Sequence, residues 1–317
     1  MSEAPIKNPS LKNAIAAPAS AYYCAAMPDA APMKVVDILT ASTQYLQGKG
    51  IEGPGMAAKL LLSRLLNCKH LELIFKYDLV LSEKQLEAMR RGIKRVAAGE
   101  PVQYVIGETG FMGHTIKTDN RALIPRPETE ILVETVLASA ALWQHAKPVI
   151  VDVGTGSGCI VVSLAKEKPG AHYLAFDVSD QALSLARENA KTLGVADHVT
   201  FAQTELGDAL EPETADAIIS NLPYIPTAVI DTLQPQVRDH EPRVALDGGA
   251  NGVEVIEGVV YDATIVLKPG GLIFLEIGAD QGKAVSTMLR DAGFENVAVK
   301  QDLAGLDRIV TGRLPEG

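Results

Sequence analysis

Cysteine is scarce in this chain of 317 residues, and its placement excludes several uses of that residue. Cys24, Cys68 and Cys159 lie far apart and form no Cys-x-x-Cys pair. An odd number of thiols without metal-ligand spacing is typical of reduced cysteines in a cytoplasmic protein. The six histidines are also scattered, and none pairs with a Glu or Cys at the spacing of a zinc site. We therefore expect a cytoplasmic protein without a structural or catalytic metal.

Basic side chains are in deficit as well, with 29 Lys and Arg against 39 Asp and Glu, and a formal net charge of −10. An acidic surface repels phosphate backbones at long range, which disfavours a large nucleic-acid substrate unless a local basic patch overcomes the repulsion. Long apolar runs are missing too, since none approaches the ~18 residues that a membrane-spanning helix needs. We expect a monomer that binds no membrane and forms no stable complex with nucleic acid.

The beginning of the chain lacks the features of a targeting signal. Five prolines interrupt residues 1–32, which contain no arginine and no continuous apolar stretch. A secretory signal needs such a stretch, and a transit peptide is rich in arginine and poor in acidic residues, whereas Glu3 and Asp29 are present here. We predict that residues 1–33 form a disordered extension. The alternative is that Met33 is the true start.

Residues 34–100 carry apolar side chains at helical spacing. Gly53-Pro54-Gly55 precedes one group of them, and Ser82, a favourable helix N-cap, precedes another. Helices with one apolar face bury that face against each other, so this spacing predicts a small helical bundle. The three stripes lie within residues 35–46, 56–66 and 86–96.

The segment that follows has a different pattern. Gly99-Glu100-Pro101 ends the helical spacing, and residues 102–118 mix apolar side chains with Gly107, Gly110 and Gly113. Glycines between short apolar runs are typical of a β-hairpin. We assign residues 101–122 to a hairpin that links two domains.

From residue 123 to the end, strand and helix patterns alternate. This alternation predicts βαβ units and an α/β domain with a mostly parallel, doubly wound sheet, closed by a terminal hairpin. The predicted strands are Val149–Val153, Tyr173–Asp177, Val199–Phe201, Ala217–Ser220 and Leu272–Ile277, with a hairpin of Val297–Val299 and Arg308–Val310. The predicted helices are Glu128–Ala141, Gly158–Lys166, Gln181–Leu193, Val253–Leu267 and Gln281–Ala292.

The strand Val149–Val153 runs into a glycine-rich turn, Gly154-Thr155-Gly156-Ser157-Gly158, and then into a helix. Glycines let the backbone turn tightly and approach a ligand that a Cβ would exclude, and the helix N-terminus offers unpaired N–H groups. The strict dinucleotide fingerprint needs Gly or Ala at position 159, where Cys159 stands. A small side chain is still tolerated there, so this turn alone leaves NAD open.

Asp177 ends the second predicted strand and supplies the next signal. A carboxylate at this place can accept hydrogen bonds from both ribose hydroxyls of an adenosine. It could instead cap the following helix, but Ser179 and Asp180 already serve that purpose. Together with the glycine turn, Asp177 predicts a cofactor that contains adenosine.

The sequence Ser220-Asn221-Leu222-Pro223-Tyr224-Ile225 follows the predicted strand Ala217–Ser220, at the same mouth of the sheet as the glycine turn. An amide nitrogen is a poor nucleophile because its lone pair is delocalised. The Asn221 side-chain oxygen and the Leu222 carbonyl can accept both hydrogens of a primary amide and so fix the orientation of its nitrogen. Pro223 favours an extended Leu222, and Tyr224 can pack on a planar amide.

At this point the chain resembles the release-factor glutamine methyltransferases, over about residues 35–314. The resemblance depends on five motifs in the same order, at residues 99–104, 123–130, 152–158, 220–225 and 241–249. It implies a Rossmann-like class I methyltransferase domain at residues 123–317 and S-adenosylmethionine as cofactor. It also implies that residues 34–100 dock the protein substrate, whose target is the glutamine in the Gly-Gly-Gln loop of a class I peptide-chain release factor.

The resemblance assigns roles to individual residues. It implies a catalytic set of Asn221, Leu222, Pro223 and Tyr224. It implies a cofactor-binding set of Gly154, Thr155, Gly156, Ser157, Gly158, Asp177, Glu205, Leu206 and Asn221. The chain departs from the family pattern at Leu222, where a proline is usual. The acidic residue near the adenine is Glu205, with Asp208 as the alternative, and Arg126 and Glu128 either close the cofactor site or cap a helix.

Other functions stay open beside this one. A nucleic-acid amino-methyltransferase uses a similar tetrapeptide on a flipped base, but it needs a basic face, and the Lys and Arg at residues 90–95 cluster on one helix that is more typical of a solvated face. A second alternative is a glutamine methyltransferase acting on a ribosomal protein, and Arg126-Pro127-Glu128-Thr129-Glu130 favours the release-factor branch over it. A third is an inactive binding module, which the intact Asn221 and Asp177 disfavour.

Overall fold

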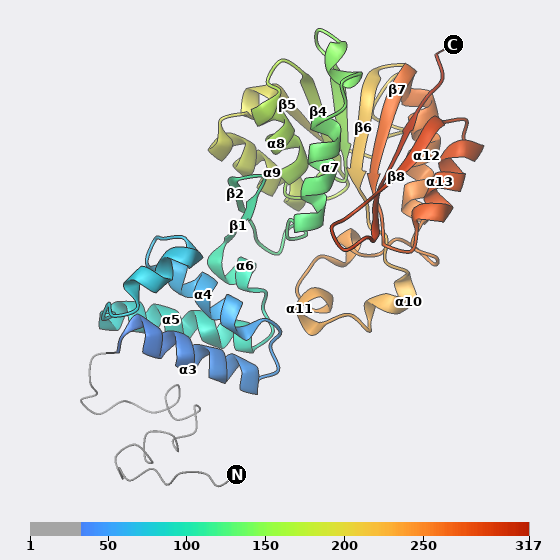
Figure 1. Ribbon diagram of the computed structural model, residues 1–317. Helices are drawn as coiled ribbons and strands as arrows, with labels where there is room; N and C mark the ends of the chain where they lie inside the picture. Colours follow the sequence, from blue (N-terminus) through green and yellow to red (C-terminus); the bar gives the residue numbers. More distant parts are fainter. Residues whose placement is uncertain (1–32, 317) are drawn as a thin grey trace, which may run out of the picture. The chain divides into compact units, whose positions relative to one another are not determined.

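The computed structural model describes residues 33–316, which form two compact units with the boundary between Ile106 and Gly107 (Figure 1). The predicted extension lies outside the described residues except for Met33. The Met33 carbonyl accepts a hydrogen bond from the Leu81 backbone N–H, and its side chain packs against the core of the first unit. Met33 therefore belongs to the folded part of the chain.

The first unit is the predicted helical bundle. Its core is built from side chains that are almost fully buried, among them Val35, Leu46, Leu62, Ile93 and Val96. The helices are α3 (Val35–Gly48), α4 (Pro54–Leu65), η1 (His70–Lys76), α5 (Glu83–Ala97) and α6 (Val102–Ile106).

Helix α5 shows how the sequence sets these elements. Ser82 is its N-cap: the Ser82 hydroxyl accepts from the Gln85 N–H, and the Gln85 side chain accepts from the Ser82 N–H at 2.9 Å. This reciprocal capping box begins the helix where the sequence predicts. Met89, Ile93 and Val96 are buried along one face, as expected from their spacing.

The predicted hairpin linker is wrong for its first residues. Val102–Ile106 is helix α6, whose first turn is closed by hydrogen bonds from the Tyr104 and Val105 N–H groups to the Pro101 carbonyl. Val102, Val105 and Ile106 have the i, i+3, i+4 spacing of a helix face, and all three pack on the bundle. The hairpin itself is present but shorter, with β1 (Glu108–Phe111) and β2 (His114–Lys117) paired antiparallel.

The second unit contains a seven-stranded sheet with the order β5-β4-β3-β6-β7-β9-β8. The first five strands in this order are parallel, and β9 is antiparallel to both of its neighbours. The predicted doubly wound α/β fold with a terminal hairpin is therefore confirmed. The strands are β3 (Val149–Val153), β4 (His172–Asp177), β5 (Val199–Gln203), β6 (Ala215–Asn221), β7 (Leu267–Glu276), β8 (Glu295–Gln301) and β9 (Asp307–Arg313).

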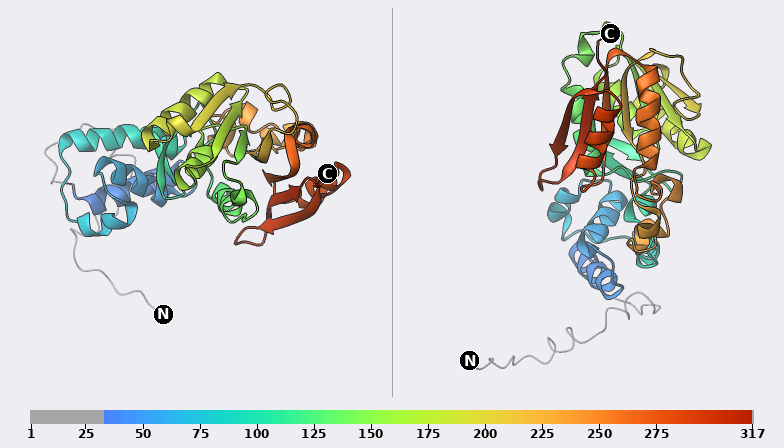
Figure 2. Two further views of the ribbon diagram at one scale, coloured as in Figure 1. Left: turned by 90° about the horizontal axis from the view of Figure 1, so that it is seen from above. Right: turned by 90° about the vertical axis from the view of Figure 1, so that its right-hand side faces the viewer.

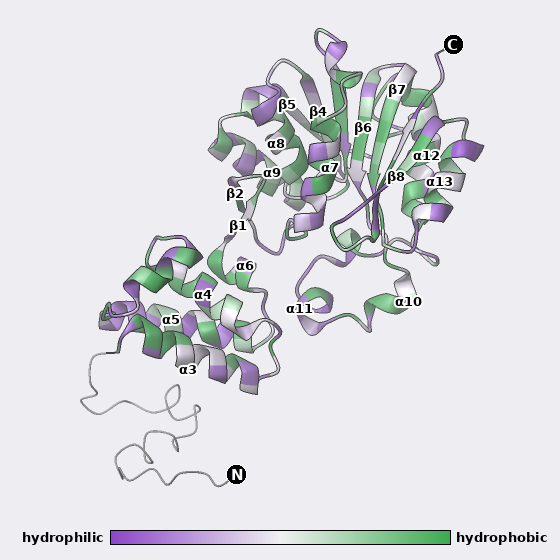
Figure 3. Ribbon diagram, viewed as in Figure 1, coloured by the Kyte–Doolittle hydropathy of each residue, from purple (hydrophilic) through white to green (hydrophobic). Residues whose placement is uncertain are grey.

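Helices cover both faces of this sheet (Figure 2). On β6, Ala217 and Ile219 face one apolar cluster and Ile218 faces the other, as the period of two in a strand requires. Figure 3 shows green and purple patches side by side on the helices, the pattern of elements with one buried and one solvated face. The first cluster takes in α7 (Pro127–Leu137), α8 (Cys159–Glu167) and part of α9 (Asp180–Leu193); the second takes in α12 (Glu254–Val266) and α13 (Gly282–Asp291).

The strand order changes direction between β3 and β6. From β3 the chain winds outward through β4 and β5, then returns to place β6 on the other side of β3. Val153 and Ser220 are paired across this junction. Loops that leave two such strands diverge and open a crevice at their carboxyl ends.

The core of the bundle provides a test of this packing. Replacing Ile93 with Ala removes a side chain that is 0% exposed, and it should lower the free energy of unfolding by about 2–5 kcal/mol. The measurement is chemical denaturation of the full chain followed by circular dichroism. Lys94→Ala, an exposed change in the same helix, is the control and should stay within about 0.5 kcal/mol of the parent. Equal effects of the two changes would contradict the packing of α5.

Candidate active site

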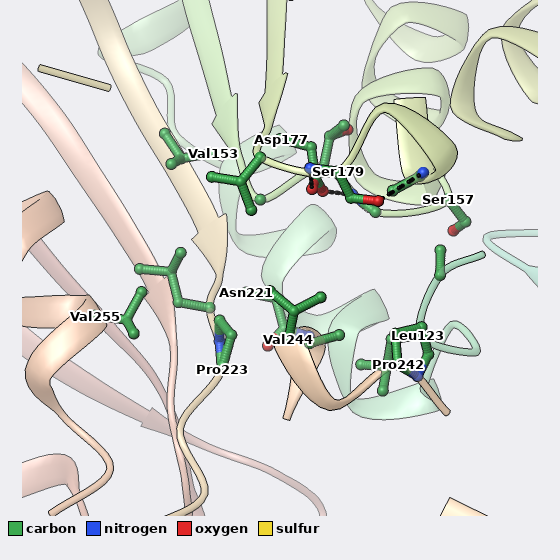
Figure 4. A pocket seen from close by; sticks show the side chains of 18 of the residues that line it. Leu123, Val153, Ser157, Asp177, Ser179, Asn221, Pro223, Pro242, Val244 and Val255 are labelled. Atoms are coloured by element: carbon green, nitrogen blue, oxygen red, sulfur yellow. Dashed lines mark hydrogen bonds between the residues drawn. The ribbon is translucent and has the colours of Figure 1, made fainter. Parts of the chain in front are cut away.

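A pocket of about 570 Å³ opens in the second unit at the carboxyl ends of β3, β4 and β6 (Figure 4). Most of the residues predicted from the sequence line it. Gly158 and Tyr224 do not. The predicted residues in the lining are Gly154, Thr155, Gly156, Ser157, Asp177, Glu205, Leu206, Asn221, Leu222 and Pro223.

The glycines of the turn have different structural tasks. Gly154 has a φ of 71°, and a Cβ there would lie 3.4 Å from the Leu222 side chain, at the pocket wall. Gly158 has a φ of 78°, and its Cβ would lie 2.9 Å from the Cβ of Ala186 in α9. The third glycine therefore lets α8 begin close to α9, whereas the first keeps the backbone accessible at the pocket.

Asp177 lies at the end of β4 with both carboxylate oxygens engaged by the backbone. The Gly156 N–H donates to Oδ2 at 2.8 Å, and the Ser179 N–H donates to Oδ1 at 2.9 Å. Burial raises the pKa of Asp177, and these N–H groups oppose that rise. The Ser179 hydroxyl caps α9 by accepting from the Ala182 N–H, so Asp177 is not needed as the cap. Each Asp177 oxygen can accept a further hydrogen bond.

A second buried carboxylate, that of Asp152, is hydrogen-bonded to the glycine-rich turn. Thr155 donates its hydroxyl proton to Asp152 Oδ2 at 2.7 Å, and Asp152 is 1% exposed. Burial raises the pKa of Asp152 to about 7, and its other oxygen has no hydrogen-bond partner among the described residues. An unpaired buried oxygen is costly, which is typical of a functional site.

The lining of the pocket distinguishes Glu205 from Asp208, the two candidates for the acidic residue near the adenine. Glu205 and Leu206 line the pocket, and Leu206 is 1% exposed. Asp208 is not part of the lining. A buried apolar side chain beside a carboxylate suits a flat, partly polar ring. The glycine turn, Asp177 and Leu206 together therefore fit an adenosine-containing cofactor.

Asn221 is the last residue of β6 and lies at the pocket with a fixed side chain. Its Nδ2 donates to the Thr129 hydroxyl of α7 at 3.1 Å. Leu222, which follows, is 5% exposed and packs in the cluster on the α12 side of the sheet. In Figure 4, Asn221 and Pro223 lie on one side of the pocket and Asp177 and Ser179 on another.

The backbone after Asn221 is held by a second glycine-rich segment. A Cβ at Gly248 would lie 2.7 Å from the Pro223 carbonyl oxygen, and one at Gly252 would lie 2.5 Å from the Tyr224 carbonyl oxygen. Only glycine permits this approach. The Gln281 side-chain amide also donates to the Tyr224 carbonyl at 3.0 Å. Tyr224 itself packs on the cluster on the α12 side, and burial, with the nearby Glu276, raises its pKa.

Arg126 closes one wall of the pocket. Its side chain makes no helix cap; it donates to Glu241 Oε1 at 2.6 Å, while the Ile124 N–H donates to Glu241 Oε2 at 3.2 Å. Of the two sequence alternatives for Arg126, wall closure is therefore the one that the contacts support. Glu128 is not part of the lining.

Several residues of the site are not predicted by the sequence pattern. Thr129 and Glu241 stand within recognised motifs, but nothing local in the sequence shows which distant group each one contacts. The apolar wall was missed because its side chains look like ordinary core residues. Its members include Leu123, Pro242, Val244 and Val255 (Figure 4).

Two family models match parts of this chain. Residues 37–107 match the family model described as the PrmC N-terminal domain, and residues 127–234 match the methyltransferase small domain. A methyltransferase from Pyrococcus furiosus is among the similar solved structures, with a TM-score of 0.49 and 15% identity, over 74% of this chain and 100% of that one.

Two relatives with similar sequences align with this chain over nearly their whole length. The release factor glutamine methyltransferase of Caulobacter vibrioides is 38% identical over 280 residues, which are 88% of this chain and 96% of that protein. The one of Chlorobaculum tepidum is 39% identical over 292 residues, which are 89% of this chain and 98% of that protein. The resemblance predicted from the motifs is confirmed, and the chain belongs to the release factor glutamine methyltransferase family.

Proposed function

We propose that this enzyme transfers the methyl group of S-adenosylmethionine to the side-chain amide nitrogen of the glutamine in the Gly-Gly-Gln loop of a class I peptide-chain release factor. The observation that carries the proposal is the place of Asn221. Its amide is fixed at the end of β6, in the same pocket as the glycine turn and Asp177. The names of the relatives support the choice of a release factor over a ribosomal protein or DNA.

The chain's own residues bind the cofactor. When bound, S-adenosylmethionine supplies an electrophilic methyl group on a sulfonium sulfur. Asp177 would accept hydrogen bonds from the ribose hydroxyls, Glu205 and Leu206 would hold the adenine, and the Gly154–Ser157 turn would receive the amino-acid portion at the start of α8.

The tetrapeptide orients the substrate amide. Asn221 Oδ1 accepts one N–H and the Leu222 carbonyl accepts the other, which aims the nitrogen at the methyl group. Such orientation can contribute ~7–11 kcal/mol in favourable systems. In the transfer the S–CH₃ bond would break as the N–CH₃ bond forms, and S-adenosylhomocysteine would leave. The nitrogen would lose one of its two protons to water, so no strong base is required. We expect activity to survive the replacement of the family's usual proline by Leu222, with a looser backbone, because the carbonyl is the working group and Pro223 favours an extended Leu222.

The helical unit, predicted at residues 34–100, docks the release factor in this proposal. Its η1 segment supports the idea because it exposes Leu71, Ile74 and Phe75 at 75, 60 and 88% of their surface. Clustered apolar side chains on a surface are typical of a protein interface. Two glycines before the target let the substrate loop extend into a narrow pocket without side-chain clashes.

We further propose that the enzyme acts as a monomer in the cytoplasm, without stable binding to nucleic acid. Translation termination takes place there, and the net charge of −10 disfavours phosphate backbones. Within residues 33–316, no helix combines the length and apolar character needed to cross a membrane.

The substrate is tested by incubating the enzyme and labelled S-adenosylmethionine with a release factor, ribosomal proteins and DNA in parallel. Mass spectrometry should find one added methyl group, on the glutamine of the Gly-Gly-Gln loop. A peptide of that loop alone should be a much poorer substrate than the intact factor because it lacks the docking contacts. Label found only in DNA or in a ribosomal protein would overturn the proposal.

Cofactor binding is tested at Asp177. Asp177→Ala should weaken the binding of S-adenosylmethionine by ~1.5–3 kcal/mol, since a charged hydrogen-bond acceptor is lost. Isothermal titration calorimetry measures the change. Asp180→Ala removes an exposed carboxylate three residues further on, outside the pocket, and should bind as the parent does. Tighter binding of NAD than of S-adenosylmethionine would refute the cofactor assignment.

The orientation mechanism is tested at the tetrapeptide. Asn221→Ala should reduce kcat by about a hundredfold or more, because the amide loses the acceptor that aligns it. Leu222→Pro restores the family's usual residue and should keep kcat close to that of the parent. Thermal melting shows that both variants are folded. Near-parental kcat in folded Asn221→Ala would exclude this mechanism.

A further inference from the structure

Glu276 lies beside Asn221 at the carboxyl end of the sheet. It is the last residue of β7, and the register of the parallel strands pairs it directly with Asn221. Side chains of paired residues in a parallel sheet point to the same face. Glu276 is 2% exposed, and its Oε2 has no hydrogen-bond partner among the described residues. Such an unpaired buried oxygen reduces stability, so its presence needs an explanation beyond folding.

The hydrogens of the Asn221 amide account for the placement of this carboxylate. Asn221 donates one hydrogen bond to the Thr129 hydroxyl at 3.1 Å. Both side chains lie close enough to Glu276 to lower the pKa of its carboxyl. The Thr129 hydroxyl accepts from Asn221, so its own proton can be donated to the neighbouring Glu276 carboxylate, which only accepts when it is ionised. An amide NH₂ has two protons; Thr129 accepts one, and the other can go to the carboxylate of Glu276, whose Oε2 lacks a partner among the described residues. The amide oxygen is then the group of Asn221 left for a ligand.

The charge on Glu276 also determines which way the side-chain amide of Asn221 is turned. Rotating the Asn221 side chain by half a turn would bring its oxygen against a carboxylate oxygen, two acceptors without a proton between them. A neutral acceptor would oppose this rotation less, because hydrogen bonds to an ionised acceptor are roughly twice as strong.

We propose that Glu276 is a positioning residue for methyl transfer: together with Thr129 it binds the amide hydrogens of Asn221 and so holds the Asn221 oxygen toward the substrate. The proposal rests on the proposed function of Asn221 as the acceptor for the substrate amide. Glu276 does not touch the substrate and acts through Asn221.

The positioning of Asn221 by Glu276 should depend on pH, because the carboxyl of Glu276 can be protonated. Burial raises the pKa of Glu276 to about 7, while the Thr129 hydroxyl and the positive charge of Arg308 act in the opposite direction. The folded-state pKa lies above the ordinary value of 4.5, so the ionised form prevails above pH 7 and is lost as the pH falls through 7. Titratable and polar groups lie around Glu276 on every side. They are Glu128 and Thr129 of α7, Cys159 of α8, Asn221 of β6, Tyr224 in the segment after β6, and Arg308 of β9.

The kinetic test compares three side chains at position 276 between pH 5.5 and 9, with a release factor as substrate. The parent should show an acid limb in kcat with a midpoint near pH 7. Glu276→Gln keeps a carbonyl acceptor but cannot titrate; it should lose about tenfold or less in kcat at pH 8, and the limb should vanish. Glu276→Leu has no acceptor and should lose about a hundredfold. KM for the release factor and the affinity for S-adenosylmethionine should change less than about threefold, since binding is not the role assigned.

Position 129 provides an independent pair of variants. Thr129→Ser keeps the hydroxyl and should retain the parental kcat, whereas Thr129→Val has the same shape without it and should lose about tenfold. Glu295→Gln, a change at an exposed carboxylate of β8, is the control and should leave the pH profile unaltered. Parental kcat in both Glu276→Leu and Thr129→Val, or an acid limb that persists in Glu276→Gln, would overturn the proposal.

A spectroscopic arm separates this inference from the proposed function. The side-chain ¹⁵N–¹H resonances of Asn221, assigned by their loss in Asn221→Ala, should shift with pH in the free enzyme with a midpoint near 7, and the shift should be absent in Glu276→Gln. If the parent fails to methylate the release factor while this titration is present, the substrate is wrong and the positioning contact stands. If methylation occurs and the Asn221 resonances do not respond to pH, the contact with Glu276 is refuted.

Discussion

The lateral pairing of β3 with β6 joins the two halves of the active site. Val153 ends β3 and faces Ser220, whose buried hydroxyl donates to the Val153 carbonyl oxygen. The next residue on β3's side is Gly154, the start of the cofactor turn, and the next on β6's side is Asn221. One residue of slippage would turn Asn221 to the opposite face of the sheet and separate the amide from the pocket. The buried residues on both faces of these strands fix the register and thereby the chemistry.

Around this junction, two distant segments complete the pocket at some cost in stability. Glu241 is 2% exposed in its side chain, and desolvating it is compensated by the Arg126 guanidinium and the Ile124 N–H. Gly248 and Gly252 in turn allow the backbone of the tetrapeptide to lie against the loop that follows Glu241. The loop therefore does two things at once, since it anchors the wall of the cofactor site and supports the residues that hold the substrate amide.

The sequence predicts those parts of the structure that depend on local pattern. The cap at Ser82, the glycine turn and the strand that ends at Asp177 were all located, because capping, positive φ and strand period leave marks within a few residues. Helix α6 was misjudged because glycines further on outweighed the helical spacing of Val102, Val105 and Ile106. Contacts across the fold leave no such mark. Thr129 lies 92 residues from Asn221, and Arg126 lies 115 from Glu241, so their pairing follows only from the folded sheet and its loops.

Glu276 shows why such distant contacts are retained although they do not favour folding. In the unfolded chain this carboxyl ionises near its ordinary pKa of 4.5, whereas in the folded chain its pKa is about 7. The free energy of unfolding therefore falls as the pH rises from 4.5 to 7. Above that range it is about 3 kcal/mol lower than it would be if the pKa of Glu276 were unshifted. A leucine in the same place would avoid this cost, but it would leave one of the two Asn221 amide hydrogens without an acceptor. The penalty is greatest at the neutral and higher pH where Glu276 is ionised, which is the state in which its carboxylate holds the amide oxygen of Asn221 toward the substrate.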